Sequence, residues 1–286
     1  MSRAERRRKS SESLIWQDSR DSAQSTLPRS GPRLDYVSLS VKMPIEAYVS
    51  IVRAAVPGQG YPRLFSPYLG EVDERLKSPL WRAVYGTPTL GLVCGDALSP
   101  SAAGWSSLSL PGDSAQTLGM DGLCNLLAAL DVPAEDIHVN RLDFAWDGVE
   151  VNREVSGDGT AATITHYRDT LYVGREESRF VVCVYTRPEG ITRIEFRVRD
   201  ASVINLILFI WMQADEPRAD PIAKTVVWDR FLRGLVRGFA AFDEWGEFFD
   251  NVRPIQVRIS DAIPLRKVEI TQWARNVQEP PGGSDG

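Results

Sequence analysis

The fold is decided by the segments Phe180-Val-Val-Cys-Val-Tyr-Thr-Arg187 and Thr192-Arg-Ile-Glu-Phe-Arg-Val-Arg199, with the tripeptide Pro188-Glu-Gly190 between them. The second long segment alternates strictly between charged and apolar residues, and the first is rich in β-branched and aromatic residues, as strands are. Proline and glycine between them are typical of a tight turn, with glycine where a positive φ is needed. The stretch therefore predicts an antiparallel hairpin.

The length of the turn decides which side chains share a face of this hairpin. A three-residue loop places Tyr185 opposite Arg193 and Cys183 opposite Glu195, and directly opposed residues point to the same side of a sheet. A two-residue loop would shift the register by one and move Glu195 to the other side from Tyr185. A shared face for Tyr185, Arg187, Arg193 and Glu195 thus requires a loop with an odd number of residues.

A third strand, Arg141-Leu-Asp-Phe-Ala-Trp-Asp147, has a polar face of the same kind, with Arg141, Asp143 and Asp147 on one side. Together these faces suit phosphoryl transfer. Tyrosine has an ordinary pKa near 10 and needs a local positive field to act as a nucleophile. Guanidinium groups supply that field and hold a phosphate, and carboxylates can bind Mg²⁺ or Mn²⁺. The competing interpretation is an ordinary half-solvated sheet face with alternating arginine and glutamate pairs.

The rest of the chain predicts an α+β fold, in which a mainly antiparallel central sheet carries the active face and is flanked by helices. We expect a disordered segment at 1–32, a single domain at 33–277 and a disordered tail at 278–286. The domain divides into a catalytic core at about 104–200 and a helical part at about 201–277. Further strands are predicted at 34–41, 104–110 and 171–173, with a strand pair at 81–93, and helices at 44–56, 120–130, 201–212, 225–242 and 264–277.

Composition limits the classes of protein to which the chain can belong. It has 286 residues, of which 43% are hydrophobic, so a sizeable core is possible. No apolar run approaches the roughly 18 residues that span a bilayer, which predicts a protein without a membrane segment. Three scattered cysteines favour a reducing compartment, and we expect the cytoplasm. A net charge of −5 argues against a protein that coats DNA non-specifically but allows a local basic groove.

Four spaced motifs occur in a fixed order, and together they resemble the replication initiation factor family of rolling-circle plasmids, phages and integrative elements. The motifs are Asn140-Arg-Leu-Asp-Phe-Ala-Trp-Asp147, Thr170-Leu-Tyr-Val-Gly-Arg-Glu-Glu-Ser-Arg-Phe180, Cys183-Val-Tyr-Thr-Arg187 and Arg193-Ile-Glu-Phe-Arg197. The resemblance covers about residues 34 to 250 and is most specific at 140–199. It implies that the protein nicks and rejoins one DNA strand through a covalent 5′-phosphotyrosine.

The resemblance also implies roles for individual residues. Tyr185 matches the nucleophile, with Arg187 and Arg193 beside it. Asp143 and Glu195 match acids that hold Mg²⁺ or Mn²⁺, and Asp147 is either a further metal ligand or the cap of a turn. The residues expected to contact DNA are Ser178, Arg179, Arg141 and Arg197.

The same resemblance implies partners: an origin DNA with a hairpin or single-stranded nick site, a host helicase and a second copy of the chain in a homodimer. Two other functions remain open. One is a conjugative relaxase of an integrative element with the same chemistry. The other is a DNA-binding regulator on this scaffold that has lost nicking. The second is favoured by the acidic pI and by Cys183 and Thr186, where the family has arginine or a similar residue and aspartate or asparagine. Arg187 also replaces the family's lysine but keeps its charge.

Overall fold

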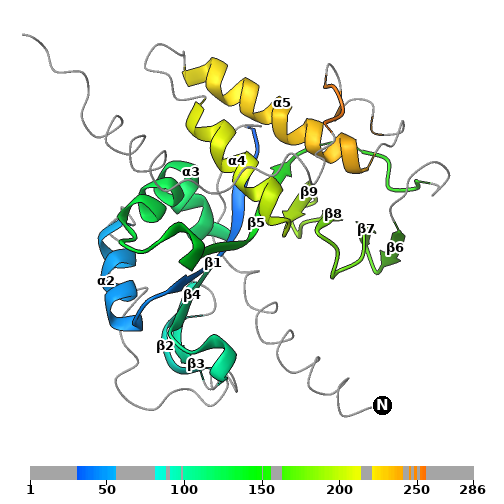
Figure 1. Ribbon diagram of the computed structural model, residues 1–286. Helices are drawn as coiled ribbons and strands as arrows, with labels where there is room; N and C mark the ends of the chain where they lie inside the picture. The colour runs from blue at the N-terminus through cyan, green and yellow to red at the C-terminus, as the bar shows by residue number, and fades with distance from the viewer. Residues whose placement is uncertain are drawn as a thin grey trace, which may run out of the picture. The chain divides into compact units, whose positions relative to one another are not determined.

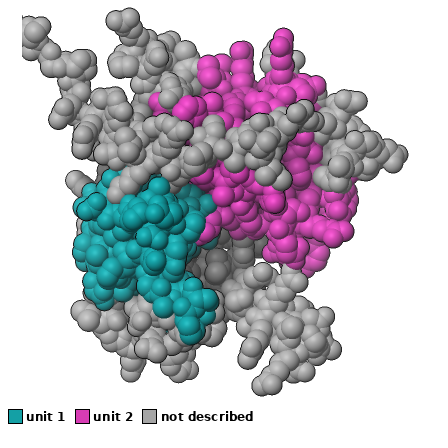
Figure 2. Space-filling model, in the orientation of Figure 1, with its two compact units in different colours: residues 1–26, 36–139, 267–286 teal, residues 27–35, 140–266 magenta. Residues whose placement is uncertain are grey.

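The computed structural model describes residues 31–55, 81–87, 91–97, 99–149, 151–155, 163–213, 221–240, 245, 248–249 and 252–255. The chain divides into two compact units (Figure 2). Unit 1 includes residues 36–139, and unit 2 includes residues 27–35 and 140–266. The predicted disordered segment at 1–32, except for its last two residues, the helix at 264–277 and the tail at 278–286 lie outside the described residues.

Unit 1 contains antiparallel strands in the order β2-β3-β4-β1, with two helices. The strands are β1 (Arg33–Lys42, whose first three residues belong to unit 2), β2 (Trp81–Thr87), β3 (Gly91–Ala97) and β4 (Trp105–Pro111). Along β1 and β4 every second residue is buried, because Leu39 pairs with Leu108 and Val37 with Leu110. The helices α2 (Ile45–Ala55) and α3 (Gly112–Ala129) pack on each other and on this sheet.

Unit 2 is built on antiparallel strands in the order β5-β9-β8-β7-β6. Their bounds are Ile137–Asp147 for β5, Ile164–Tyr167 for β6, Thr170–Val173 for β7, Phe180–Thr186 for β8 and Thr192–Val198 for β9. One face of this sheet is apolar, with Phe144, Ile194 and Val182 fully buried. Alternation along the strands sends Asp143, Glu195 and their polar neighbours to the opposite face.

Helices α4 (Ala201–Gln213) and α5 (Pro221–Phe239) pack against the apolar face of the unit 2 sheet (Figure 1). The contacts are aromatic: Phe144 meets Trp228 edge-on with ring centroids 5.9 Å apart, and Phe180 lies 5.5 Å from Phe239. The indole of Trp146 donates to Asp229 Oδ1 on α5 at 2.8 Å. These contacts leave the polar face of the same strands free of α4 and α5.

Helix α5 also holds the segment that follows it. A Cβ on Gly238 would lie 2.0 Å from the carbonyl oxygen of Ile255, so only glycine allows the backbone at 252–255 to approach the helix. Arg233 donates to the carbonyl of Phe248 at 2.9 Å, and Arg237 donates to the carbonyl of Val252. These two arginines are therefore occupied by backbone groups.

The α+β class and the antiparallel sheet flanked by helices are confirmed, and most predicted elements lie within a few residues of their observed bounds. Strand β6 was not predicted, because its residues are largely exposed and only Ile164 is aliphatic. Helix α3 begins at Gly112, before the predicted start at residue 120, and bends at Gly119, where φ is 61°. None of the helices in the described ranges is long and apolar enough to cross a membrane.

Candidate active site

The turn between β8 and β9 has the odd length on which a shared face depends. Arg187 N–H donates to the carbonyl of Ile191 at 2.9 Å, and Gly190 N–H donates to the carbonyl of Arg187 at 2.9 Å. Gly190 has a φ of 78°, which glycine adopts without strain. The three-residue loop Pro188–Gly190 is thus confirmed, and Tyr185 pairs with Arg193 as predicted.

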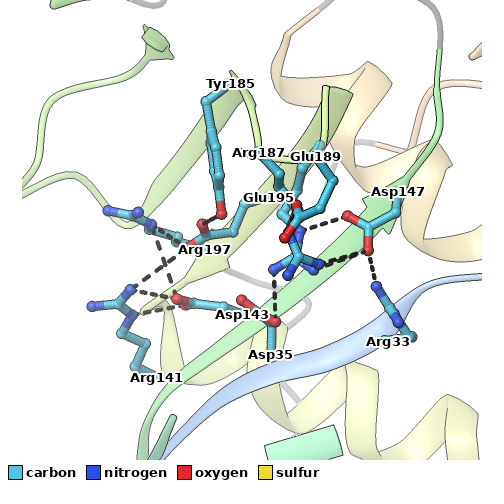
Figure 3. A network of polar contacts seen from close by, with 11 residues as sticks. Arg33, Asp35, Arg141, Asp143, Asp147, Tyr185, Arg187, Glu189, Glu195 and Arg197 are labelled. Atoms are coloured by element: carbon cyan, nitrogen blue, oxygen red, sulfur yellow. Dashed lines mark hydrogen bonds and ion pairs between the residues drawn. The ribbon is translucent and has the colours of Figure 1, made fainter. Parts of the chain in front are cut away.

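Three strands bring the predicted residues together in rows across one face. Arg193 on β9 pairs with both Asp147 on β5 and Tyr185 on β8. One row further along, Glu195 lies between Ala145 and Cys183. The row after that contains Asp143, Arg197 and Val181. Strand alternation and the odd loop therefore produce a patch of phenol, carboxylates and guanidinium groups from separate strands (Figure 3).

The first part of this patch, which we call the phenol cluster, consists of Tyr185, Glu195, Arg197, Asp143 and Arg141. The Tyr185 hydroxyl donates to Glu195 Oε2 at 3.4 Å. Arg197 Nε donates to Glu195 Oε1 at 2.7 Å and lies 3.9 Å from Asp143 Oδ2. Arg141 Nε donates to Asp143 Oδ1 at 2.7 Å, and its Nη2 bonds to the other carboxylate oxygen. Each acid of the cluster is thus held by its own arginine.

The second part, the Asp147 cluster, consists of Asp147, Asp35, Arg33, Arg187 and Arg193. Arg193 donates two hydrogen bonds, of 2.6 and 2.9 Å, to Asp147, and its Nη1 donates to Asp35 at 3.1 Å. Arg33 also binds Asp147, and Arg187 lies 3.4 Å from it. The hydrogen bonds described for Asp147 thus come from three arginines, Arg33, Arg187 and Arg193.

Arg33 and Asp35 were missed in the sequence analysis. Both lie at the start of β1 and alternate with buried Leu34, so they share the polar side of that strand. The same face-by-face treatment that was applied to β5 and β9 would have identified them as polar-face residues. Their partners, in contrast, depend on contacts between residues more than 110 positions apart.

Ser178 and Arg179 lie at the other end of β8. The Ser178 hydroxyl accepts the Arg175 backbone N–H at 3.0 Å, and Arg179 pairs with Asp200 at 3.1 Å. Asp200 also accepts the N–H groups of Ser202 and Val203, and so caps the start of α4. At about 3.3 Å per residue, the Arg179 end of β8 is roughly 20 Å from Tyr185. The structure does not bring these two residues to the phenol cluster.

Burial dominates the titration behaviour of the phenol cluster. Burial raises the pKa of Tyr185, and the nearby charge of Glu195 raises it further, which together outweigh the lowering by Arg193. The expected lowering of the Tyr185 pKa is therefore not seen in the protein by itself. Burial would raise the pKa of Glu195 as well, but Arg197 and Arg141 reverse the shift and keep its pKa low. Glu195 is the charged acceptor beside the phenol.

Asp143 differs from Glu195, because burial raises its pKa to about 7 despite Arg141. Its side chain is 1% exposed. An acid whose pKa is higher in the folded state destabilises the fold as pH rises from the unfolded pKa, near 3.9, to the folded one. Each pH unit in that window costs about 1.4 kcal/mol. We expect the melting temperature of Asp143→Asn, relative to wild type, to rise between pH 5 and pH 7.5. A difference independent of pH would contradict the raised pKa.

No family model matches the chain, and no curated protein matches it.

Proposed function

We propose that the protein is a rolling-circle replication initiator that nicks and rejoins one DNA strand with Tyr185 as its nucleophile. The observation that carries the proposal is the position of the Tyr185 hydroxyl, 3.4 Å from the carboxylate of Glu195 and beside the guanidinium of Arg193. Nucleophilic hydroxyls in enzymes are activated in this way, by an adjacent base and a positive field. The order of the motifs in the sequence supports DNA as the substrate.

In the proposed step the Tyr185 oxygen attacks a phosphodiester, and its proton passes to Glu195. The bond between phosphorus and the 3′ oxygen of the neighbouring nucleotide breaks. Tyr185 becomes esterified to the 5′ phosphate, and the released 3′ oxygen takes up a proton, which leaves a free 3′ hydroxyl. The reverse reaction rejoins the strand. Because one phosphate ester replaces another, no oxidant or external energy source is needed.

The guanidinium groups around the phenol have distinct parts in this scheme. Among the arginines of the two clusters, Arg193 and Arg187 are nearest the turn end of the hairpin. They would stabilise the negative charge that develops on the scissile phosphate. Arg197 keeps Glu195 in its charged form. Arg141, which lies on the Asp143 side of the cluster, also favours the charged form of Glu195. Ser178 and Arg179 are too distant for the scissile phosphate, so their proposed contact is with DNA further along the strand.

A divalent cation is part of the proposal, and its ligands would be Asp143 and Glu195. Their oxygens are the donor type that Mg²⁺ and Mn²⁺ prefer, and the cation would neutralise charge on the phosphate. Both oxygens of Asp143 are bonded to Arg141, however, so a cation has to compete with that guanidinium. Within the described residues, no three His, Cys, Asp or Glu side chains form a group that could hold a metal ion. A phosphate oxygen would have to complete the coordination.

Cation binding can be measured without DNA cleavage. Titration of the protein with Mn²⁺, followed by electron paramagnetic resonance of the free ion, should show a weak site. We expect Asp143→Asn to weaken that site at least tenfold. Asp147→Asn should leave it unchanged, because Asp147 is bonded to Arg193 and Arg33 in the other cluster. Equal losses in both variants, or none in Asp143→Asn, would contradict the assignment of the ligands.

The direct test uses a supercoiled plasmid that carries the DNA flanking the gene, incubated with the protein and Mn²⁺. We expect nicked circles with protein covalently attached at the 5′ end. Mass spectrometry of the digested adduct should place a nucleotide phosphate on Tyr185. Specific DNA binding without nicking or adduct would instead favour the regulator, for which the raised pKa of Tyr185 is the supporting observation. A conjugative relaxase would give the same adduct, and a host helicase and a homodimer remain proposals of the same scheme.

A further inference from the structure

The tip of the β6–β7 hairpin lies at the same end of the sheet as Tyr185. Tyr167, the last residue of β6, pairs with Thr170 on β7. Leu171 pairs with Val184, and the same register places Thr170 opposite Tyr185. Tyr167 therefore continues the row that contains Asp147, Arg193 and Tyr185, and it points to the same side of the sheet. Two strand spacings separate it from Tyr185, or about 10 Å.

Tyr167 is exposed in a way that its neighbours in this row are not. It is 60% exposed, the largest value among the exposed large hydrophobic residues that the structure describes. The guanidinium of Arg168 lies 5.3 Å from the centre of its ring. Arg168 has a φ of 52° and is the single residue other than glycine with a positive φ within the described ranges. Such strain is retained at binding sites more often than elsewhere.

The hairpin tip is also anchored to the site. Arg153 donates to the carbonyl of Asp169 at 3.4 Å, to the hydroxyl of Thr192 at 3.3 Å and to the hydroxyl of Thr186. These contacts tie the backbone of the β6–β7 turn to Thr186 and Thr192, a pair at the turn end of β8 and β9 next to Tyr185. The turn that carries the exposed ring of Tyr167 is thus anchored to the strand of Tyr185.

We infer that Tyr167 is a stacking platform for a base of single-stranded DNA next to the scissile phosphate, with Arg168 on the adjoining phosphate. This rests on the proposed function. The separation of about 10 Å spans between one and two nucleotides of a stretched single strand. Stacking of bases on aromatic rings is largely independent of sequence, and it accompanies basic groups that follow the backbone. Specificity for the nick site therefore has to come from other contacts.

The test measures binding, so it does not depend on cleavage. Fluorescence anisotropy of fluorescein-labelled dT12 in low salt, without metal, would give the Kd of each protein. We expect Tyr167→Ala to raise Kd about 5- to 100-fold, and Tyr167→Trp to keep the wild-type value. Arg168→Ala should reduce the slope of log Kd against log salt concentration by about one. The matched control is Val227→Ala on α5, a residue 55% exposed, which should bind as wild type does.

Wild-type affinity in Tyr167→Ala would overturn the inference, as would an absence of dT12 binding by the wild-type protein. A loss in Tyr167→Phe as large as in Tyr167→Ala would also overturn it, because the hydroxyl and not the ring would then be responsible. If Tyr167→Ala weakens binding but no adduct forms on Tyr185, the platform stands and the nicking function falls.

Discussion

Tyr185→Phe is expected to form no covalent DNA adduct, a loss of at least about a thousandfold, since removal of an enzyme's nucleophile typically abolishes the covalent step. The substitution deletes one oxygen and leaves the ring in place between β9 and β7. It removes the hydrogen bond of 3.4 Å to Glu195 and the one shared with Arg193, but no apolar packing, so the fold should persist. The measurement is a denaturing gel of protein and labelled DNA, with circular dichroism to show that the variant is folded.

Tyr172→Phe is the matched control for this experiment. Tyr172 pairs with Cys183, so it lies on the same face as Tyr185, one row away and half-buried. Burial raises its pKa, and no hydrogen bond to a carboxylate is seen for it among the described contacts. We expect Tyr172→Phe to form adduct as wild type does. An adduct that persists in Tyr185→Phe and disappears in Tyr172→Phe would show that Tyr172, and not Tyr185, is the nucleophile.

Arg193→Met is expected to lower the free energy of unfolding by about 3–5 kcal/mol, the usual cost of breaking a buried ion pair from one side. Arg193 is 7% exposed and is hydrogen-bonded to both Asp147 and Asp35. Methionine keeps much of the volume but removes the buried charge that both carboxylates share, which leaves Arg33 and Arg187 to balance Asp147. Urea unfolding, followed by tryptophan fluorescence, would measure the change.

Two comparisons show whether the lost charge is the cause. Arg187→Met removes a more exposed arginine whose contacts with Asp147 and Glu189 are both longer, at 3.4 Å, and it should cost less than about 1 kcal/mol. Asp147→Asn, added to Arg193→Met, should recover part of the loss, because one of the two negative charges that Arg193 balanced is then gone. An equal fall in the free energy of unfolding for Arg193→Met and Arg187→Met would mean that burial of the Arg193–Asp147 ion pair contributes little to stability.

Much of the candidate site could be predicted from the sequence, because strand alternation and loop length are local properties. The pairing of Tyr185 with Arg193 follows from a turn of three residues, and the position of Asp143 follows from its place on its own strand. Neither inference needed knowledge of distant parts of the chain.

The properties that could not be predicted depend on tertiary packing. The raised pKa of Tyr185 is caused first by burial, which the sequence does not specify residue by residue. The division into two clusters depends on Arg33 and Asp35, which reach the site from a distant strand. The spacing of Arg233 and Arg237 on α5 also does not show that backbone carbonyls of the following segment accept hydrogen bonds from them.

The glycines of α5 make this helix dependent on the chain that follows it. Glycine inside a helix costs about 1 kcal/mol relative to alanine, and Gly234 and Gly238 are one turn apart. Their lack of side chains is what lets the Ile255 N–H reach the Gly234 carbonyl at 2.8 Å. A chain cut before residue 252 would retain this cost and lose the contacts that offset it. The aromatic layer beneath β8 would then loosen, so a truncation far from Tyr185 in sequence would act on the geometry of its hydroxyl.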